Sequence, residues 1–338
     1  MGLTHKGVNY DVGTNYLPDG VLSRGEWRPD LMRQEIRAIR DQLHANSVGI
    51  YGTDLERLVQ TATVALEHGL HVWLQPRLID AAPQETLDHL TRTAEAAELL
   101  RKEYGTIDLN VGCELTVFSA GIIPGASHED RSAKLASPLY WPLFPQFNRK
   151  LNRLLGRAAA VAKSAFGGRI TYGSGLWERV DWTPFDVVGL DYYRMPYNRS
   201  RYVKNLRSFH RYSKPVVIVE FGCGGYNGAA EKGPSSHAII DRGGPTPVIN
   251  GSWVRNEQVQ AEHVAELIGI YEEENVQGAY VFEFIEPHHP HSADPRHDLD
   301  MAGYGIVKVI QDDAAGSYRW EPKAAFHEVA RLYSSQAI

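Results

Sequence analysis

The chain has 338 residues and a formal net charge of −6, with 43% hydrophobic and 22% charged residues. There is no basic excess, which argues against a nucleic-acid-binding protein, and no apolar run approaches the ~20 residues of a membrane span. Only two cysteines occur, which excludes a disulfide framework. The first residues lack a charged segment followed by an apolar one, so we expect a cytoplasmic protein that binds neither membrane nor nucleic acid.

Short apolar runs alternate with longer amphipathic stretches along the chain. The runs are rich in β-branched and aromatic residues, which is typical of strands. We predict strands at residues 6–10, 47–51, 70–76, 107–113, 169–173, 185–193, 215–222 and 278–284. The amphipathic stretches repeat apolar residues about once per helical turn. We predict helices at residues 28–44, 54–69, 83–104, 138–166, 253–274 and 322–334.

Alternating strands and helices predict a parallel sheet in a protein of the α/β class. Eight such units without a linker favour a single (β/α)8 TIM barrel over residues 1–338, rather than an open sheet with a second domain. Residues 175–184, after the fifth strand, are too few for a full helix. Extended loops follow strands 4, 7 and 8, and we expect them at the carboxyl ends of the strands, where barrel enzymes build their sites. These loops are residues 118–137, 222–252 and 285–302.

Two glutamates stand at the ends of predicted strands. Glu114 ends the fourth strand in VGCEL, and Glu220 ends the seventh in IVEFG. In a barrel these side chains face each other across the mouth. A pair of carboxyl groups suits glycoside hydrolysis, in which one protonates the leaving oxygen and the other attacks the anomeric carbon or stabilises its charge. A separation of about 5–5.5 Å gives retention of configuration, and roughly 6.5–9.5 Å gives inversion.

The pair resembles the arrangement of the clan A (4/7 superfamily) retaining glycoside hydrolases. KPVVIVEFG, RNEQVQAEHVAELI and GAYVFEF are similar to strand 7, the next helix and strand 8 of that clan, and WEPKAAFHEVARLY is similar to its last helix. The resemblance covers nearly the whole chain. It implies that Glu220 is the nucleophile and Glu114 the acid/base, with a hydrogen bond to Glu220 from Tyr192 or Tyr193. It also implies a small glycoside or oligosaccharide as substrate, and no cofactor.

The chain departs from the clan pattern at two positions. Cys113 precedes the acid/base, where the clan commonly has an asparagine that contacts the sugar 2-hydroxyl. Gly49 stands where the clan commonly has an arginine on strand 2. Arg77 and Arg194 are candidates for the missing positive charge. Either the substrate differs at its 2-position, or other groups take over, or activity on ordinary sugars has been lost.

Further side chains at predicted strand ends are candidate substrate ligands. Aromatic rings stack on the C–H faces of sugars, and polar groups bind the hydroxyls. The candidate substrate-binding residues are Tyr10, Asp11, Tyr51, Arg77, Cys113, Trp177, Tyr192, Tyr193, Arg194, Glu283 and His288. Asp191, at the end of the sixth strand, is another candidate hydroxyl ligand. Glu283 and Glu286 are spare acids, either of which would change the assignment if it replaced Glu220.

Two alternatives remain open at the sequence level. Residues 286–300, EPHHPHSADPRHDLD, hold several histidines and acids that suit zinc, which would make the chain a metal-dependent barrel hydrolase. These residues lie in one proline-rich loop rather than on several strands, so we expect no metal. The second alternative is a non-catalytic sugar-binding relative, suggested by Cys113 and Gly49. The sequence indicates neither the sugar nor the oligomeric state.

Overall fold

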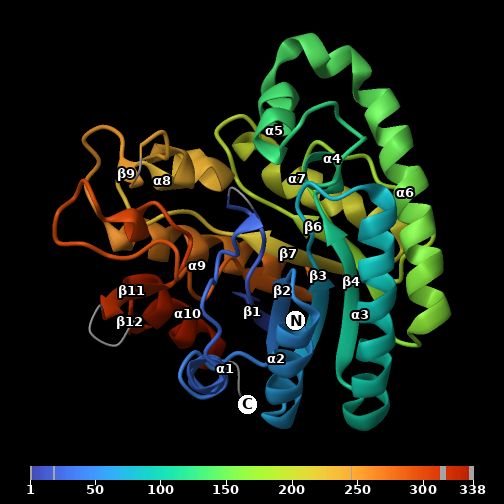
Figure 1. The fold of residues 1–338 in the computed structure, drawn as a ribbon, viewed down its shortest axis with the longest axis horizontal. Coiled ribbons are helices and arrows are strands. Elements are labelled where there is room, and N and C mark those ends of the chain that lie inside the picture. Colours follow the sequence, from blue (N-terminus) through green and yellow to red (C-terminus); the bar gives the residue numbers. More distant parts are fainter. Residues whose placement is uncertain (1, 18–19, 245, 313–316, 335–338) are drawn as a thin grey trace.

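The structure is a computed structural model that describes residues 2–17, 20–244, 246–312 and 317–334. Eight parallel strands close into a barrel in the order β1-β10-β7-β6-β5-β4-β3-β2 (Figure 1). This confirms the predicted (β/α)8 fold. The barrel strands are β1 (His5–Asp11), β2 (Ser47–Gly52), β3 (His71–Pro76), β4 (Ile107–Cys113), β5 (Ile170–Ser174), β6 (Val188–Asp191), β7 (Val216–Phe221) and β10 (Gly278–Val281).

The barrel strands are buried on both faces, which explains their continuous apolar sequences. Inside the barrel, the free space bounded by Asn9, Trp73, Asn110 and Tyr280 is only about 10 Å³. The interior is therefore a packed core rather than a channel, and substrates can reach only its open ends.

Long helices cover the outside of the barrel, with α3 and α6 side by side on one flank (Figure 1). The long helices are α1 (Pro29–Asp41), α2 (Leu55–Glu67), α3 (Pro83–Tyr104), α6 (Phe144–Ala165), α9 (Glu257–Glu273) and α10 (Ala324–Ser334). Side-chain caps fix two starts, since Asp54 accepts from the amide of Arg57 and Asn256 from that of Gln258. Within the described chain, no helix is long and apolar enough to cross a membrane.

Several elements differ from the sequence-based predictions. Residues 138–143 form a 3-10 helix ahead of α6, because Pro142 interrupts the expected longer helix. As predicted, residues 175–184 contain no helix, and the strand expected at 185–193 is shorter, Val188–Asp191. The segment between β6 and β7 holds only α7 (Tyr202–Arg207) and short 3-10 turns on either side of it. The antiparallel pairs β8 (Ile240–Asp241) with β9 (Val248–Ile249), and β11 (Val307–Asp312) with β12 (Ser317–Pro322), were not predicted.

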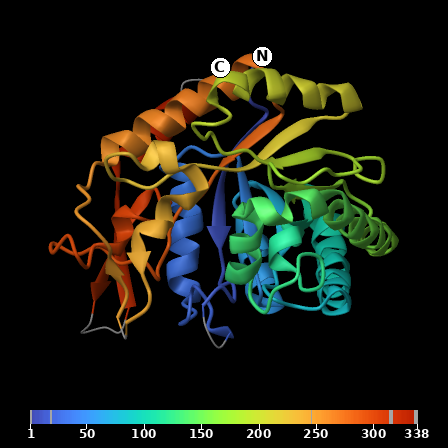
Figure 2. The same cartoon turned by 90° about the horizontal axis from the view of Figure 1, so that it is seen from above.

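The long loops follow β4, β7 and β10 and carry short helices of their own. The loop after β4 holds α4 (Leu115–Phe118) and α5 (His128–Ala136), and the loop after β7 holds α8 (Ala229–Lys232). Helix α10 lies beside the start of β1, at the side of the molecule away from these loops (Figure 2). There the Lys6 ammonium donates to the carbonyl of Tyr333 at 2.7 Å, and the Tyr333 hydroxyl donates to that of Gly7 at 2.9 Å.

Candidate active site

The Glu220 carboxylate lies at the carboxyl end of β7 and has a full set of neighbours. Arg77 Nη2 donates to its Oε1 at 2.6 Å, and the Tyr193 hydroxyl approaches its Oε2 at 3.4 Å. The Cys113 sulfur lies 3.5 Å from Oε1. A register shift between Leu190 and Asp191, where β6 pairs with β7, brings Asp191 opposite Glu220. Glu220 is thus a buried, oriented carboxylate whose charge is compensated by one arginine.

Arg77 supplies the positive charge for which the sequence offered two candidate arginines. Its guanidinium also donates to the Tyr16 hydroxyl at 2.5 Å and to Gln75 at 3.2 Å, and it lies 4.0 Å from the centre of the Tyr51 ring. Gly49 has no room for a side chain, because a Cβ there would lie 2.2 Å from Asn9 Oδ1. The charge that the clan places on strand 2 therefore comes from the end of β3 in this chain.

Arg194 is not brought to Glu220. Its guanidinium forms a bidentate pair with Glu266 of α9, with both N–O distances at 2.5 Å. This pair ties the segment after β6 to the outer helix. Of the two candidate arginines, the structure brings only Arg77 to Glu220.

Glu114 lies directly after β4, in the turn that starts α4. Its backbone is left-handed, with φ of 42°, a conformation that costs non-glycine residues free energy and is found at functional sites. The side chain is half-buried, and among the described residues its carboxyl has no hydrogen-bond partner. Burial raises the pKa of Glu114 well above its usual range, and the negative charges of Asp191 and Glu220 raise it further. These properties suit a carboxylic acid that keeps its proton near neutral pH.

Cys113 and Asp191 lie beside Glu220. The Cys113 thiol donates to Asp191 Oδ2 at 3.2 Å, and within the described chain Asp191 Oδ1 is buried without a hydrogen-bond partner. Burial raises the pKa of both groups, and the charge of Glu220 raises that of Asp191 further. Gly173 faces this carboxyl, and a Cβ there would approach both its oxygens at 3.1 Å. The site therefore contains a third carboxyl group, that of Asp191, and it is buried.

Glu178 is a fourth acid in this region, and no sequence pattern pointed to it. It follows β5 in an irregular loop, far in sequence from both glutamates, and only the folded chain brings it under the turn after β4. Burial raises its pKa to about 7, although hydrogen bonds from Thr116 and Tyr172 lower it. Trp177 lies in the same loop, where its indole N–H donates to Thr116 Oγ1 at 2.8 Å.

Tyr51 and Glu283 extend the site toward the end of β10. The Tyr51 hydroxyl donates to Glu283 Oε2 at 2.7 Å, and burial, with the nearby charges of Glu286 and Asp11, raises the pKa of Glu283 well above its usual range. Tyr51 contacts the Arg77 guanidinium through its ring face. Glu220, Arg77, Tyr193, Cys113 and Asp191 form one group of contacts, the Glu220 cluster. Tyr51 and Glu283 adjoin this cluster through Arg77.

Three other candidates have internal partners. The Tyr10 hydroxyl donates to Glu35 of α1, and the Tyr192 hydroxyl donates to the carbonyl of Tyr202 at 2.7 Å. Asp11 Oδ1 accepts from the Gly13 amide at 2.8 Å and from the Thr14 hydroxyl at 2.9 Å. These contacts stabilise the barrel wall and the loop after β1, and none of them joins the Glu220 cluster.

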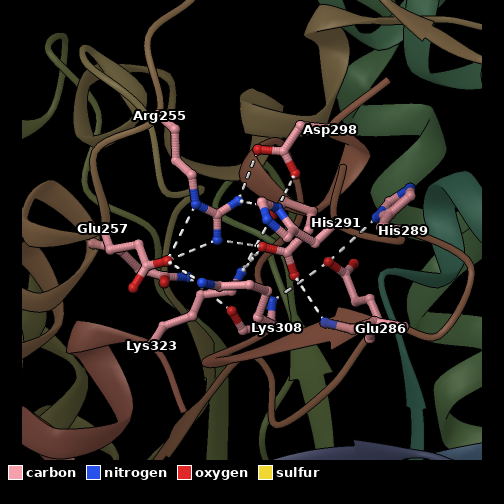
Figure 3. Close-up of polar contacts among 12 residues, drawn as sticks. Arg255, Glu257, Glu286, His289, His291, Asp298, Lys308 and Lys323 are labelled. Atoms are coloured by element: carbon pink, nitrogen blue, oxygen red, sulfur yellow. Dashed lines mark hydrogen bonds and ion pairs between the residues drawn. The ribbon is translucent and has the colours of Figure 1, made fainter. Parts of the chain in front are cut away.

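The histidine-rich loop is tied together by ion pairs (Figure 3). Arg255 reaches both Asp298 and Asp300 at 2.8 Å, and His291 lies 2.8 Å from Asp298. Lys323 pairs with the same Asp300 at 2.8 Å. Most of the charged groups that suggested a metal are therefore partners of one another.

In the described chain, two groups of residues each bring three potential metal ligands together. One consists of Glu286, His288 and His289, and the other of Cys113, Asp191 and Glu220. In the first, His289 Nε2 lies 2.9 Å from an Arg242 nitrogen, and Glu286 accepts from the Tyr304 amide at 2.6 Å. In the second, the Arg77 guanidinium already compensates the charge of Glu220. Cationic neighbours oppose a metal ion in both places. Burial lowers the pKa of His288 to about 3, so its ring is neutral.

A closed (β/α)8 barrel with acids at the ends of β4 and β7 has the architecture of the barrel glycoside hydrolases. Searches of protein-family models and of curated protein sequences find no match. Among solved structures, a GH113 β-1,4-mannanase matches with a TM-score of 0.64 at 14% identity, covering 99% of this chain and 100% of the other. The GH113 β-mannanase of Alicyclobacillus acidocaldarius gives 0.61 at 18% identity, with 99% and 98% covered. A broad-specificity GH5 endoglucanase from Clostridium longisporum gives 0.57 at 11% identity, with 98% and 96% covered. The fold is shared with these enzymes over the whole chain.

Proposed function

We propose that this chain is a retaining glycoside hydrolase with Glu220 as nucleophile and Glu114 as acid/base. The observation that carries the proposal is the contrast between the two carboxyls at the ends of β4 and β7. Glu220 is held by Arg77 and Tyr193 with its charge compensated, whereas the Glu114 carboxyl has no hydrogen-bond partner among the described residues and has a raised pKa. One acid is prepared to attack and the other to donate a proton.

The proposed reaction has two displacements. Glu220 attacks the anomeric carbon while Glu114 gives its proton to the departing glycosidic oxygen, which forms a glycosyl-enzyme ester and releases the aglycone. Glu114, now ionised, removes a proton from water, and this water hydrolyses the ester with net retention of configuration. Tyr193 and Arg77 hold the Glu220 carboxylate in one orientation during both steps.

The fold neighbours suggest the substrate class. Their names describe enzymes that act on β-1,4-mannan and on glucan, so we propose β-linked manno- or gluco-oligosaccharides, or small glycosides of these sugars, as first substrates. We propose one catalytic barrel domain over residues 1–338. A cytoplasmic location stays a prediction, and it favours small substrates over polymers.

A fluorosugar trap tests the mechanism directly. A panel of aryl β-glycosides identifies a substrate, and the matching 2-deoxy-2-fluoro glycoside with a good leaving group should then label Glu220, as seen by peptide mass spectrometry. NMR of the first-formed product should show the β-anomer. Labelling of Glu283 or Glu286 would overturn the assignment of the nucleophile. Activity that survives in both Glu220→Ala and Glu114→Gln would overturn the proposed function, and loss of wild-type activity on chelation would favour the metal-dependent alternative.

A further inference from the structure

The carboxyl group of Glu178 accepts four hydrogen bonds, two from the turn after β4 and two from β5 and the loop after it. Glu178 Oε1 accepts from the amide of Thr116 at 3.1 Å and from its hydroxyl at 2.7 Å. Its Oε2 accepts from the Tyr172 hydroxyl at 2.8 Å and from the Gly175 amide at 3.2 Å. A single buried carboxyl therefore joins β5, the loop after β5 and the first turn of α4.

The same set of contacts fixes the backbone on both sides of Glu114. The Glu114 amide donates to the carbonyl of Gly173 at 2.9 Å, and the next amide, of Leu115, donates to the Tyr172 hydroxyl at 2.7 Å. Tyr172 thus accepts from the turn while it donates to Glu178. The left-handed φ of Glu114 persists because its neighbours are held in this way.

The Glu114 side chain depends on this backbone for its direction. Its carboxyl has no hydrogen-bond partner among the described residues, so no side chain orients it directly. The charged groups that face it are Asp191 of β6, Glu220 of β7, Glu178 and, with opposite sign, Arg77. Three of the four are acids, so the fixed turn holds the Glu114 carboxyl beside them, and their charges contribute to its raised pKa.

We propose that Glu178 is a positioning residue for the acid/base, which fixes the turn after β4 and thereby aims the Glu114 carboxyl at the glycosidic oxygen. The inference rests on the proposed glycosidase function. Glu178 acts through Thr116 and Tyr172 and does not touch the substrate. Trp177, bonded to the same Thr116 hydroxyl, belongs to this support.

Leaving-group dependence separates this role from a merely structural one. Glu178→Gln keeps the size of the side chain but can satisfy only part of the four donors. A misplaced acid slows substrates with poor leaving groups, which need the proton, and spares dinitrophenyl glycosides, which do not. We expect kcat/KM to fall by about 10-fold or more for the poor leaving groups and to change by less than about twofold for the activated ones. Tyr172→Phe should show the same pattern.

One control variant, Asp108→Asn, and the dependence of activity on Glu114 keep the outcomes distinct. Asp108→Asn removes a buried carboxylate at the other end of β4, bound to His71 and Arg169, and should change both substrate classes equally. Equal slowing of both classes in Glu178→Gln, or no slowing, would overturn the inference. Wild-type activity that does not depend on Glu114 would instead overturn the proposed function.

A measurement that needs no turnover tests the inference in the absence of an identified substrate. In a carbon-13 NMR titration, removal of the Glu178 charge should lower the pKa of Glu114, because Glu178 is one of the groups that raise it. The basic limb of the pH profile should move to lower pH in the same variant. An unchanged Glu114 titration, with an unchanged turn in a crystal structure of Glu178→Gln, would refute the positioning role even if no substrate is known.

Discussion

The two ends of strand β4 carry buried acids in opposite conditions. Asp108, at the start of the strand, accepts hydrogen bonds from His71 and Arg169, and these partners lower its pKa against the effect of burial. Glu114, just past the other end, has no such partner among the described residues and a raised pKa. One strand thus presents a paired acid that stabilises the fold and an unpaired acid prepared for proton transfer.

The largest effect is expected at the catalytic end of the barrel, from the substitution of Glu220, whose charge Arg77 compensates. Glu220→Gln should lower kcat by roughly 10⁴-fold or more, because the nucleophile is removed. Thermal stability should fall as well, since the buried Arg77 guanidinium loses its charged partner. Initial rates on an aryl glycoside and a melting curve measure the two effects. Near-normal turnover would exclude Glu220 as nucleophile.

Substitution of Glu114 should have the next largest effect on catalysis. Its effect on thermal stability should be opposite in sign to that of Glu220→Gln. Glu114→Gln should lower kcat/KM by about 10²–10⁴-fold for substrates with poor leaving groups. Its melting temperature should hold or rise, because an unpartnered buried acid among like charges is lost. Added azide should restore turnover of an activated substrate in this variant. A clear loss of stability would show that Glu114 is paired after all.

Substitution of Asp108, the acid with hydrogen-bond partners, should change the stability of the protein rather than its catalysis. Asp108→Asn should lower the free energy of unfolding by about 1.5–3 kcal/mol, the range for hydrogen bonds to a charged group. kcat/KM of the folded enzyme should stay near the wild-type value, since Asp108 lies at the opposite end of the barrel. Urea denaturation and steady-state kinetics on the same sample test both parts.

The pH dependence of stability should show the smallest but most diagnostic difference. Glu178 has a folded pKa of about 7, above its unfolded value, so its contribution is full at low pH and is lost as the pH rises from about 4.3 toward 7. Asp108 has a lowered folded pKa, so its contribution is present above about 3.9 and is lost as the pH falls. The melting temperature, measured from about pH 2 to about pH 8, should change less with pH above about 4.3 in Glu178→Gln and less with pH below about 3.9 in Asp108→Asn.

The sequence predicted the barrel because each strand is a short apolar run, and it predicted Glu114 and Glu220 because an acid ending such a run stands out. It also supplied Arg77 and Arg194 as candidates for the charge beside Glu220, but it could not choose between them, because the choice depends on which side chain reaches β7 in the folded barrel. Glu178 gave no signal, since a lone acid in an irregular loop looks like a solvated residue until Tyr172 and Thr116 are folded onto it. The hairpin β11–β12 was missed because its strands lie outside the repeating barrel units.

The pairing of β1 with β10 also bears on how the chain is made. The first barrel strand finds its last partner only about 270 residues later, and α10 then packs against the same strand. At ribosomal rates of about 5–20 residues per second, the open edge of β1 waits roughly 15 to 55 s for closure. During that interval β2 is the only barrel neighbour available to β1. A nascent chain stalled before residue 278 should therefore expose an unpaired edge strand and depend on chaperones to stay soluble.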